Sequence, residues 1–238
     1  MDPSRTRCQT PFRWAMWRGL EDMGRMQATK ETYEVRLARD PRDVEGAQRL
    51  RYRVFVEELA GDGTLVDHDR RLERDRFDPF FEHLVLVDPR RDPDTLEHVA
   101  GVYRLMTEGA AAQAGRFYSE DEYDLAPLRA SGRPLLELGR SCVAPELRGS
   151  SALLLLWQGL GQFVQDRGIE LLFGVASFHG TDPEALAHPL AFLHHNHLAP
   201  EDLRPRARED AFAAMDVLTA EEVDRAQALR ALPSLLKS

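Results

Sequence analysis

Two apolar stretches of the sequence carry charged residues that could bind a carboxylate and orient or deprotonate an amine. Arg104 lies within VAGVYRLM at 99–106, and Glu137 and Arg140 lie three residues apart within ELGRSCV at 137–143. A guanidinium can hold a carboxylate through two parallel hydrogen bonds, and a carboxylate can orient or deprotonate an amine that attacks a carbonyl group. The alternative for Glu137 is an ion pair with Arg104 or Arg140, and Arg140 could instead fix a nearby acidic loop.

An acidic stretch between residues 60 and 80 could bind a cation. Its carboxylates are Asp62, Asp67, Asp69, Glu73, Asp75 and Asp78. Together with two glycines, these residues predict an irregular loop. Asp67, Asp75 and Asp78 are candidates to pair with a cationic group, whereas a solvated loop is the alternative for each acid taken singly.

Ser141 and Cys142 invite a nucleophile hypothesis. No Gly-x-Ser-x-Gly elbow surrounds the serine and no partner base can be assigned, so direct attack by an amine is favoured. Cys142 is expected to be a small buried strand residue. His194, His195 and His197 lack a nearby carboxylate or cysteine to complete a ligand set, and no metal site is expected.

The elements that must position these residues follow from hydrophobic periodicity. TYEVRLA at 32–38 predicts a first strand, and the apolar spacing across 42–58 predicts an amphipathic helix. HLVLVD at 83–88 and HVAGVYRLM at 98–106 are joined by a turn-rich segment, which indicates a β-hairpin. Arg104 is therefore expected in the second strand of that hairpin.

The second half of the chain predicts a parallel unit. PLLELGRSCVAP at 134–145 indicates a long strand, followed by an apolar helix over about 148–167 with Gly168 at its C-cap. GIELLFGVASF at 168–178 indicates another strand, and a strand, a helix and a strand in this order give a parallel βαβ unit. Further helices are predicted over 183–196 and 219–231.

Composition restricts the function classes. The formal net charge of −9 argues against a general nucleic-acid binder. The arginines between residues 36 and 53 are either solvated surface or a patch for an acidic partner. Only Cys8 and Cys142 are present, which favours a reducing compartment, and no run of 18 apolar residues occurs.

The N-terminus is expected to lie apart from the folded domain. Residues 11–26 mix aromatic and aliphatic residues with arginines, as an interfacial helix does, and a disordered leader or a helix packed on the domain is the alternative. We therefore expect an extension over 1–30 and one folded domain over 31–238.

The order of the predicted elements is that of the GNAT acyltransferases, although many α/β folds would satisfy it. More specific sequence motifs are RYRVFVEE at 51–58, FDPFFEHLVLVD at 77–88, VAGVYRLM at 99–106, ELGRSCV at 137–143, LLLLWQGL at 153–160 and LFGVASFHGTDP at 172–183. In these motifs the chain resembles the ornithine-acyl carrier protein N-acyltransferase family, hemolysin-like relatives included, over roughly residues 33–236.

The resemblance implies a fold, a reaction and a set of site residues. The fold would be α/β (α+β), a GNAT-like three-layer arrangement with a central mixed twisted sheet flanked by helices. The reaction would transfer a 3-hydroxyacyl group from acyl carrier protein to the α-amine of ornithine, giving lyso-ornithine lipid, with no further cofactor. Glu137 and Arg140 are the expected catalytic residues. The expected substrate-binding residues are Arg104, Asp67, Asp75, Asp78 and Ser141.

The segment expected to bind the acyl donor departs from the coenzyme A pattern. GNAT enzymes that use coenzyme A follow an Arg-x-x-Gly-x-Gly pattern that holds phosphates on backbone N–H groups. Here RGSSAL at 148–153 places Ser151 and Leu153 where the glycines would be, which favours an acyl carrier protein donor. An ordinary helix start is the alternative. The expected donor-binding residues are Val143, Arg148, Gly149, Ser150 and Ser151.

Two departures from the family pattern bear on activity. Family members usually continue past the segment that corresponds to LPSLLKS at 232–238, so this chain is either a fragment or naturally short, with an incomplete C-terminal part of the sheet. The strand at 168–178 would then have an uncovered edge. Glu82 stands where the family usually has aspartate.

Two other functions stay open at this point. An acyl-homoserine-lactone synthase, which would need S-adenosylmethionine, is similar around RYRVF and the acidic loop. A catalytically silent paralogue that binds acyl carrier protein is the other alternative. The expected location is the cytoplasm, with peripheral contact to the inner membrane as an option.

Overall fold

The structure is a computed structural model that describes residues 33–178, 180, 182–233 and 236. The predicted extension over 1–30, and with it the helix or leader of residues 11–26, lies outside the described residues. Within the described part of the chain, no helix has the length and apolar character needed to span a membrane.

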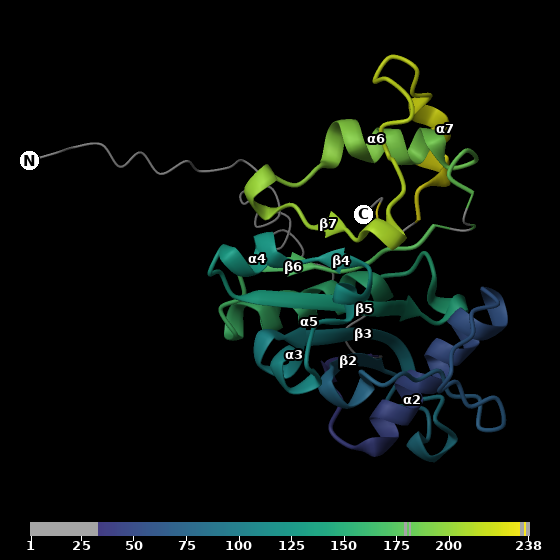
Figure 1. The fold of residues 1–238 in the computed structure, drawn as a ribbon. Coiled ribbons are helices and arrows are strands. Elements are labelled where there is room, and N and C mark those ends of the chain that lie inside the picture. Colours follow the sequence, from purple (N-terminus) through teal and green to yellow (C-terminus); the bar gives the residue numbers. More distant parts are fainter. Residues whose placement is uncertain (1–32, 179, 181, 234–235, 237–238) are drawn as a thin grey trace, which may run out of the picture.

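A five-stranded mixed sheet forms the centre of the molecule (Figure 1), in the order β1-β2-β3-β5-β6. β1 (Glu34–Leu37), β2 (Glu82–Val87), β3 (Val99–Thr107) and β5 (Leu135–Val143) pair antiparallel to their neighbours, and β6 (Leu171–Phe173) runs parallel to β5. The predicted hairpin and parallel unit are therefore confirmed. A separate two-stranded ribbon joins β4 (Tyr123–Asp124) to β7 (Arg206–Ala207).

Helices cover both faces of the sheet, as alternating strand residues require. On β2, Leu84 and Leu86 pack in the core beneath α5 (Ala152–Asp166), whereas Val85 and Val87 pack in the core beneath α2 (Pro41–Arg51). Successive strand residues point to opposite faces, so two cores follow from one strand. The predicted three-layer, GNAT-like fold is confirmed.

The helix predicted over 42–58 has two parts. Asp40 caps α2 by accepting hydrogen bonds from the backbone N–H groups of Arg42 and Asp43. The helix then widens into a π-helix, η2 (Tyr52–Glu58). Inserted π turns shift the side-chain register of a helix and are frequent at functional sites.

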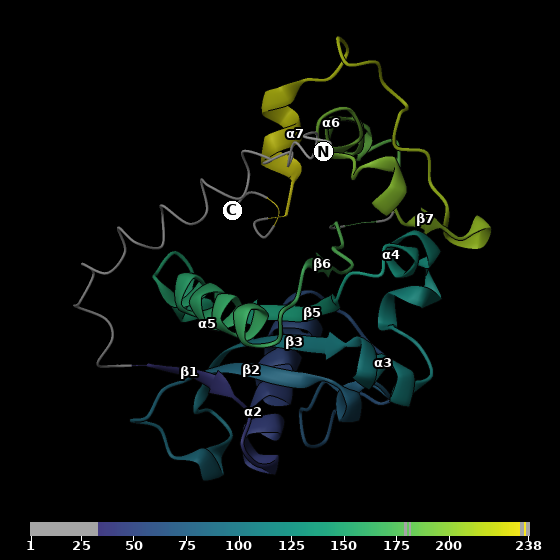
Figure 2. The ribbon, with the colours of Figure 1, turned by 90° about the vertical axis from the view of Figure 1, so that its left-hand side faces the viewer.

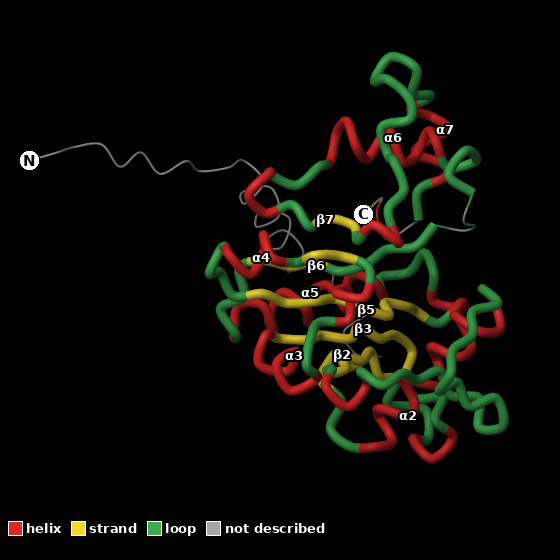
Figure 3. Tube along the Cα trace, viewed as in Figure 1, coloured by secondary structure: helices red, strands yellow, loops and turns green. Residues whose placement is uncertain are grey.

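The shorter helices connect strands or lie beyond β6. α3 (Glu108–Ala114) and α4 (Ala126–Ala130) lie between β3 and β5 in the chain, and α6 (Ala187–His197) packs on α7 (Arg225–Ala231). Both figures place α6 and α7 past the β6 edge (Figures 1 and 2), where most of the chain is loop (Figure 3). Single 3₁₀ turns occupy Asp78–Phe80, Pro93–Thr95, Tyr118–Asp121, Pro145–Leu147, Glu201–Leu203 and Glu209–Ala211.

Several predicted boundaries were wrong. The helix expected from 148 begins at Ala152, because Gly149 adopts a φ of 78° and residues 148–151 form a turn. The strand expected over 168–178 extends only from Leu171 to Phe173. The helix expected over 183–196 spans 187–197, and the one expected over 219–231 spans 225–231.

Candidate active site

Six charged residues from four parts of the chain meet on the α2 side of the sheet, and we call them the charged network. They are Arg51, Glu73, Asp75, Asp78, Arg104 and Arg140. Three are cations and three are carboxylates, and ion pairs of 2.6 to 3.7 Å join them. The network ties the acidic loop to α2, β3 and β5.

Arg51 is the centre of the network and is fully buried. Its Nε donates to Glu73 Oε2 at 2.6 Å, and Nη1 and Nη2 donate to the two carboxylate oxygens of Asp78 at 2.8 and 2.9 Å. Burial by itself would raise the pKa of Asp78, but the adjacent Arg51 and Arg104 outweigh it and hold that pKa far below its ordinary value. Asp78 is therefore ionised and structural.

The Nε edge of the Arg104 guanidinium makes no hydrogen bond within the described part of the chain. Its Nη1 donates to Asp75 at 2.8 Å and to Asp78 at 2.7 Å, while its Nε is buried without a hydrogen-bond partner among the described residues. A Cβ atom added to Gly139 would lie 3.9 Å from both Nε and Nη2. The free edge of Arg104 thus faces a stretch of β5 that carries no side chain.

A β-bulge in β5 directs Arg140 into the network. The β3 register pairs Arg104 with Gly139 and Val102 with Cys142, so Arg140 and Ser141 together oppose Tyr103. Arg140 adopts a φ of 48°, in the left-handed region. Its Nε donates to Glu73 at 3.1 Å, so Arg140 contacts the acidic loop as the alternative interpretation expected. A catalytic role for Arg140 stays a prediction.

The bulge also separates Ser141 from the network. Ser141 forms its side-chain hydrogen bond with Tyr103, which belongs to the core under α5 on the opposite face of the sheet. Asp67 is likewise apart, because it pairs with Arg74 at 3.0 Å and bridges to Leu72 within the loop. Of the predicted substrate-binding residues, the structure therefore brings together Arg104, Asp75 and Asp78.

Glu137 lies in the middle of β5 and is only 1 % exposed. Its carboxylate accepts hydrogen bonds from the backbone N–H groups of Tyr118 at 2.7 Å and Ser119 at 2.6 Å, and from the hydroxyl of Ser119. Within the described part of the chain it forms no ion pair with Arg104 or Arg140, so that alternative was wrong. Burial raises the pKa of Glu137 and the hydrogen bonds from Ser119 and Tyr118 oppose the rise. A role as general base stays a prediction.

Sequence reasoning missed three residues of this site: Arg51, Glu73 and Tyr118. Arg51 is the first residue of the RYRVFVEE motif, but the predicted helix is rich in arginines, and spacing alone did not distinguish Arg51 from the others. Glu73 lies in the acidic loop, where only a contact with Arg51 reveals its role. No sequence pattern indicated Tyr118, because this residue lies in a turn 14 residues after Arg104.

The expected donor-binding residues lie where β5 loses its partner. β6 pairs only with residues 135–137 of β5, so among the described residues the β6 side of 138–143, including Val143, has no strand beside it. In the turn before α5, Arg148 pairs with Glu58 at 2.6 Å and the Ser150 hydroxyl donates to Leu147 O at 2.6 Å. Ser151 is the N-cap residue of α5 and makes no side-chain cap.

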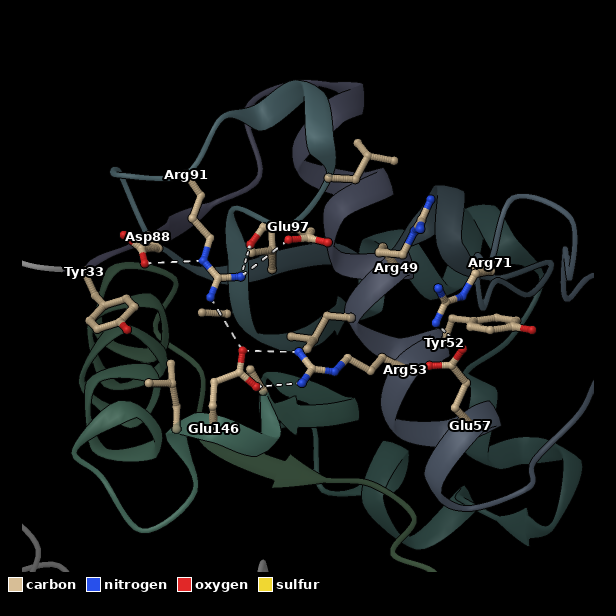
Figure 4. Close-up of a pocket in the computed structure, with 16 residues that line it drawn as sticks. Tyr33, Arg49, Tyr52, Arg53, Glu57, Arg71, Asp88, Arg91, Glu97 and Glu146 are labelled. Atoms are coloured by element: carbon tan, nitrogen blue, oxygen red, sulfur yellow. Dashed lines mark hydrogen bonds and ion pairs between the residues drawn. The ribbon is translucent and has the colours of Figure 1, made fainter.

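A separate cavity of about 410 Å³ lies between α2, the start of β3 and the end of β5 (Figure 4). Figure 4 shows Arg53 and Arg91 pointing at Glu146 from two sides, at 2.8 and 3.6 Å. The cavity contains no member of the charged network, and ion pairs engage most of its charges. The cavity is therefore a site separate from the network.

The described residues contain no group of three or more histidines, cysteines or carboxylates placed to hold a metal ion. His195 Nε2 lies 2.8 Å from the carbonyl oxygen of Leu218. The expectation of no metal and no further cofactor stays a prediction.

Comparison with known proteins first defines the class. Residues 50–158 match the acetyltransferase (GNAT) domain, a span that includes every member of the charged network and extends into the first half of α5. Together with the mixed sheet flanked by helices, this match shows that the chain contains a GNAT domain.

Curated relatives narrow the class. The chain is 57% identical over 213 residues to an L-ornithine N(alpha)-acyltransferase of Rhodobacter capsulatus, covering 90% of this chain and 82% of the relative. It is 42% identical over 207 residues to one of Brucella abortus, covering 86% and 73%. The chain belongs to the L-ornithine N(alpha)-acyltransferase family. It also aligns at 18% identity and a TM-score of 0.43 with the acyl-homoserine-lactone synthase LasI, covering 61% of this chain and 72% of that one.

Proposed function

We propose that this protein transfers a 3-hydroxyacyl group from acyl carrier protein to the α-amine of ornithine, giving lyso-ornithine lipid. The amine attacks the thioester carbonyl, the new C–N bond forms, the C–S bond breaks, and the proton lost by the amine leaves with the thiol of the carrier. The names of the relatives support ornithine as the acceptor. The nature of the donor is argued from this chain.

The observation that carries the proposal is the free edge of Arg104. A buried guanidinium N–H without a partner costs free energy unless a ligand satisfies it. A carboxylate matches this edge, because Nε and Nη2 can donate two parallel hydrogen bonds. We assign the α-carboxylate of ornithine to this edge, beside Gly139.

The charge balance of the network suits a substrate with both signs of charge. Three arginines face three carboxylates, so the network as a whole presents no excess charge to a simple anion. Asp75 is the network carboxylate with the most exposed side chain, at 21%. We assign the side-chain ammonium of ornithine to Asp75, while Asp78 stays committed to Arg51 and Arg104.

The half-open β5 supports the donor assignment. Backbone groups along residues 139–143, on the side without a neighbouring strand, can hold an extended thioester arm in the way that a strand would. The turn at 148–151 has one glycine, so close backbone approach to a pyrophosphate is disfavoured, whereas a single phosphate can be held. These features favour acyl carrier protein over coenzyme A, and an amphiphilic product favours action at the cytoplasmic membrane surface.

The test is an acylation assay with purified protein, L-ornithine and 3-hydroxyacyl-acyl carrier protein, with Arg104→Lys as the variant. Lysine keeps the charge but loses the planar edge, so the KM for ornithine should rise roughly tenfold or more. Parallel reactions replace the donor with 3-hydroxyacyl-coenzyme A, or ornithine with S-adenosylmethionine. An unchanged KM for ornithine in Arg104→Lys contradicts the substrate assignment, and a preference for coenzyme A contradicts the donor assignment.

A further inference from the structure

We propose that Glu137 is a positioning residue that holds Tyr118 against Arg104 and Arg140, and that Tyr118 forms one wall of the ornithine site. The proposal rests on the function proposed above and gives Glu137 a role other than that of general base. Tyr118 comes from the turn between α3 and β4, which has no place in the expected set of site residues.

The first step is the way Glu137 holds the turn. Tyr118 and Ser119 begin a 3₁₀ turn, and the N–H groups that start such a turn have no partner inside it. Glu137 accepts both of them, and its Oε1 also accepts the hydroxyl of Ser119. Both carboxylate oxygens of Glu137 are therefore engaged by the turn, Oε2 by the N–H of Tyr118 and Oε1 by the N–H and the hydroxyl of Ser119.

The second step is the position of the Tyr118 ring. Its centroid lies 5.7 Å from Cζ of Arg104 and 5.3 Å from Cζ of Arg140, so a single ring contacts both arginines. Phe77 packs against the same ring edge-to-face at 5.4 Å. Arginine and aromatic rings attract each other at these distances, more strongly when water is excluded.

The third step is what this arrangement does for the substrate. Arg104 lies between the Phe81 ring, at 4.2 Å from its Cζ, and the Tyr118 ring. Rings near the guanidinium limit its rotation, and a fixed plane is what two parallel hydrogen bonds to a carboxylate need. Moving Tyr118 would therefore loosen the free edge of Arg104 without touching the acyl donor.

The experiment separates positioning from base catalysis through steady-state kinetics of Glu137→Gln and Tyr118→Ala. If Glu137 positions Tyr118, both variants raise the KM for ornithine roughly tenfold, leave the KM for the donor unchanged and keep the wild-type pH profile of kcat. The double variant should be no worse than the poorer single variant, because both changes remove the same contact. Tyr118→Phe keeps the ring, so its KM for ornithine should lie much closer to that of the wild type than to that of Tyr118→Ala.

A base role predicts a different pattern. Glu137→Gln would then lower kcat by about 10²-fold or more, with the KM for ornithine unchanged and the acidic limb of the pH profile lost. Tyr118→Ala would not share that phenotype. A fall in kcat of Glu137→Gln with an unchanged KM, or an unchanged KM for ornithine in Tyr118→Ala, overturns the proposal. Tyr118→Ala keeps the proposal testable if Glu137→Gln fails to fold.

Glu120→Gln is the matched control for simple loosening of the turn. Glu120 accepts the N–H of Phe117 in the same turn and pairs with Arg129, away from the two site arginines. This variant should lower stability without raising the KM for ornithine. An equal rise in KM would show that any weakening of the turn has the same effect and would overturn a specific role for Glu137.

A readout that needs no substrate distinguishes failure of this inference from failure of the proposed function. Hydrogen exchange of peptides covering residues 117–121 should be slow in the wild type and faster in Glu137→Gln. Unchanged exchange overturns the inference even if the enzyme is active. Absence of ornithine acylation by the wild type, with exchange behaving as expected, counts against the function alone.

Discussion

The guanidinium of Arg51 has no contact with solvent, and its two carboxylate partners arrive from a loop 22 and 27 residues farther along the chain. Buried pairs of this kind are a weak source of stability by themselves, but removing one partner leaves the others charged and unsolvated. The acidic loop therefore depends on Arg51 for its position.

Arg51→Met should lower the free energy of unfolding by about 3–5 kcal/mol, because it leaves Glu73 and Asp78 without their main partner. Arg53→Met is the matched control two residues along, where the Arg53–Glu146 pair is about half exposed. That change should cost less than about 1 kcal/mol. Urea denaturation of both variants measures the difference, and equal costs would contradict the buried role of Arg51.

Asp43 supplies a prediction about acid stability. Burial raises its pKa, but hydrogen bonds from Arg36, the N–H of Arg39 and His98 outweigh that effect and bring the pKa to about 2. A carboxyl whose folded pKa is depressed contributes stability that is complete above its ordinary pKa and is lost as the pH falls through the folded value. The free energy of unfolding should therefore fall between about pH 4 and pH 2.

Asp43→Asn removes this titration, so its unfolding free energy should fall less steeply over that pH range than that of the wild type. Denaturation with urea at several pH values measures both slopes. Identical slopes would show that Asp43 does not contribute to the acid dependence.

The strand pattern and the resemblance of the acidic loop correctly predicted that some candidate residues lie together, although their role in binding substrate stays a prediction. Arg104, Asp75 and Asp78 are of this kind. The prediction that Ser141 lies beside them was wrong, because a bulge at Arg140 changes which side chains share a face of the sheet. Nothing in ELGRSCV indicates a bulge. The three donors to Glu137 were also unpredictable, since they come from a turn 18 and 19 residues away.

At the scale of elements, α5 packs against the sheet so closely that one of its glycines is needed. A Cβ atom added to Gly159 would lie 2.4 Å from Cγ1 of Val35 on β1, whereas one added to Gly161 would meet nothing within 4 Å. Both glycines are in the same helix, so their intrinsic helix propensity is the same. Only packing distinguishes them.

Gly161→Ala should stabilise the protein by up to about 1 kcal/mol through helix propensity. Gly159→Ala should destabilise it by about 1 kcal/mol or more, since the stiff Val35 side chain must shift. Thermal denaturation of the two variants measures both effects. Stabilisation by Gly159→Ala would contradict the contact between α5 and β1.

Element types were predicted better than element lengths. Periodicity correctly indicated β2, β3, β5 and α5, because each buries a regular face. The strand expected over 168–178 was too long, because β6 ends at Phe173. The next residue, Gly174, packs against β5 so closely that an added Cβ atom would lie 2.3 Å from the carbonyl oxygen of Leu138. That close approach is a tertiary contact that an apolar run in the sequence does not reveal.

At the scale of the whole molecule, many arginines pair with carboxylates from other parts of the chain. The arginine-rich stretch at 36–53 was open to interpretation as a patch for an acidic partner, but Arg36, Arg42 and Arg53 each pair with a carboxylate. Arg51 is buried in the network. These arginines therefore do not form a basic patch without compensating carboxylates, although their exposed pairs contribute little stability. If the donor is acyl carrier protein, as proposed, we expect it to dock at the open side of β5.

The most direct test of the central claim is the product formed by the purified protein from 3-hydroxyacyl-acyl carrier protein and ornithine labelled with heavy nitrogen at the α-amine. The account predicts, by tandem mass spectrometry, a 3-hydroxyacyl amide whose labelled nitrogen carries the acyl group, and much less of it from Arg104→Lys at low ornithine concentration. An amide on the unlabelled side-chain nitrogen, or no acylated ornithine from a folded protein, would contradict it.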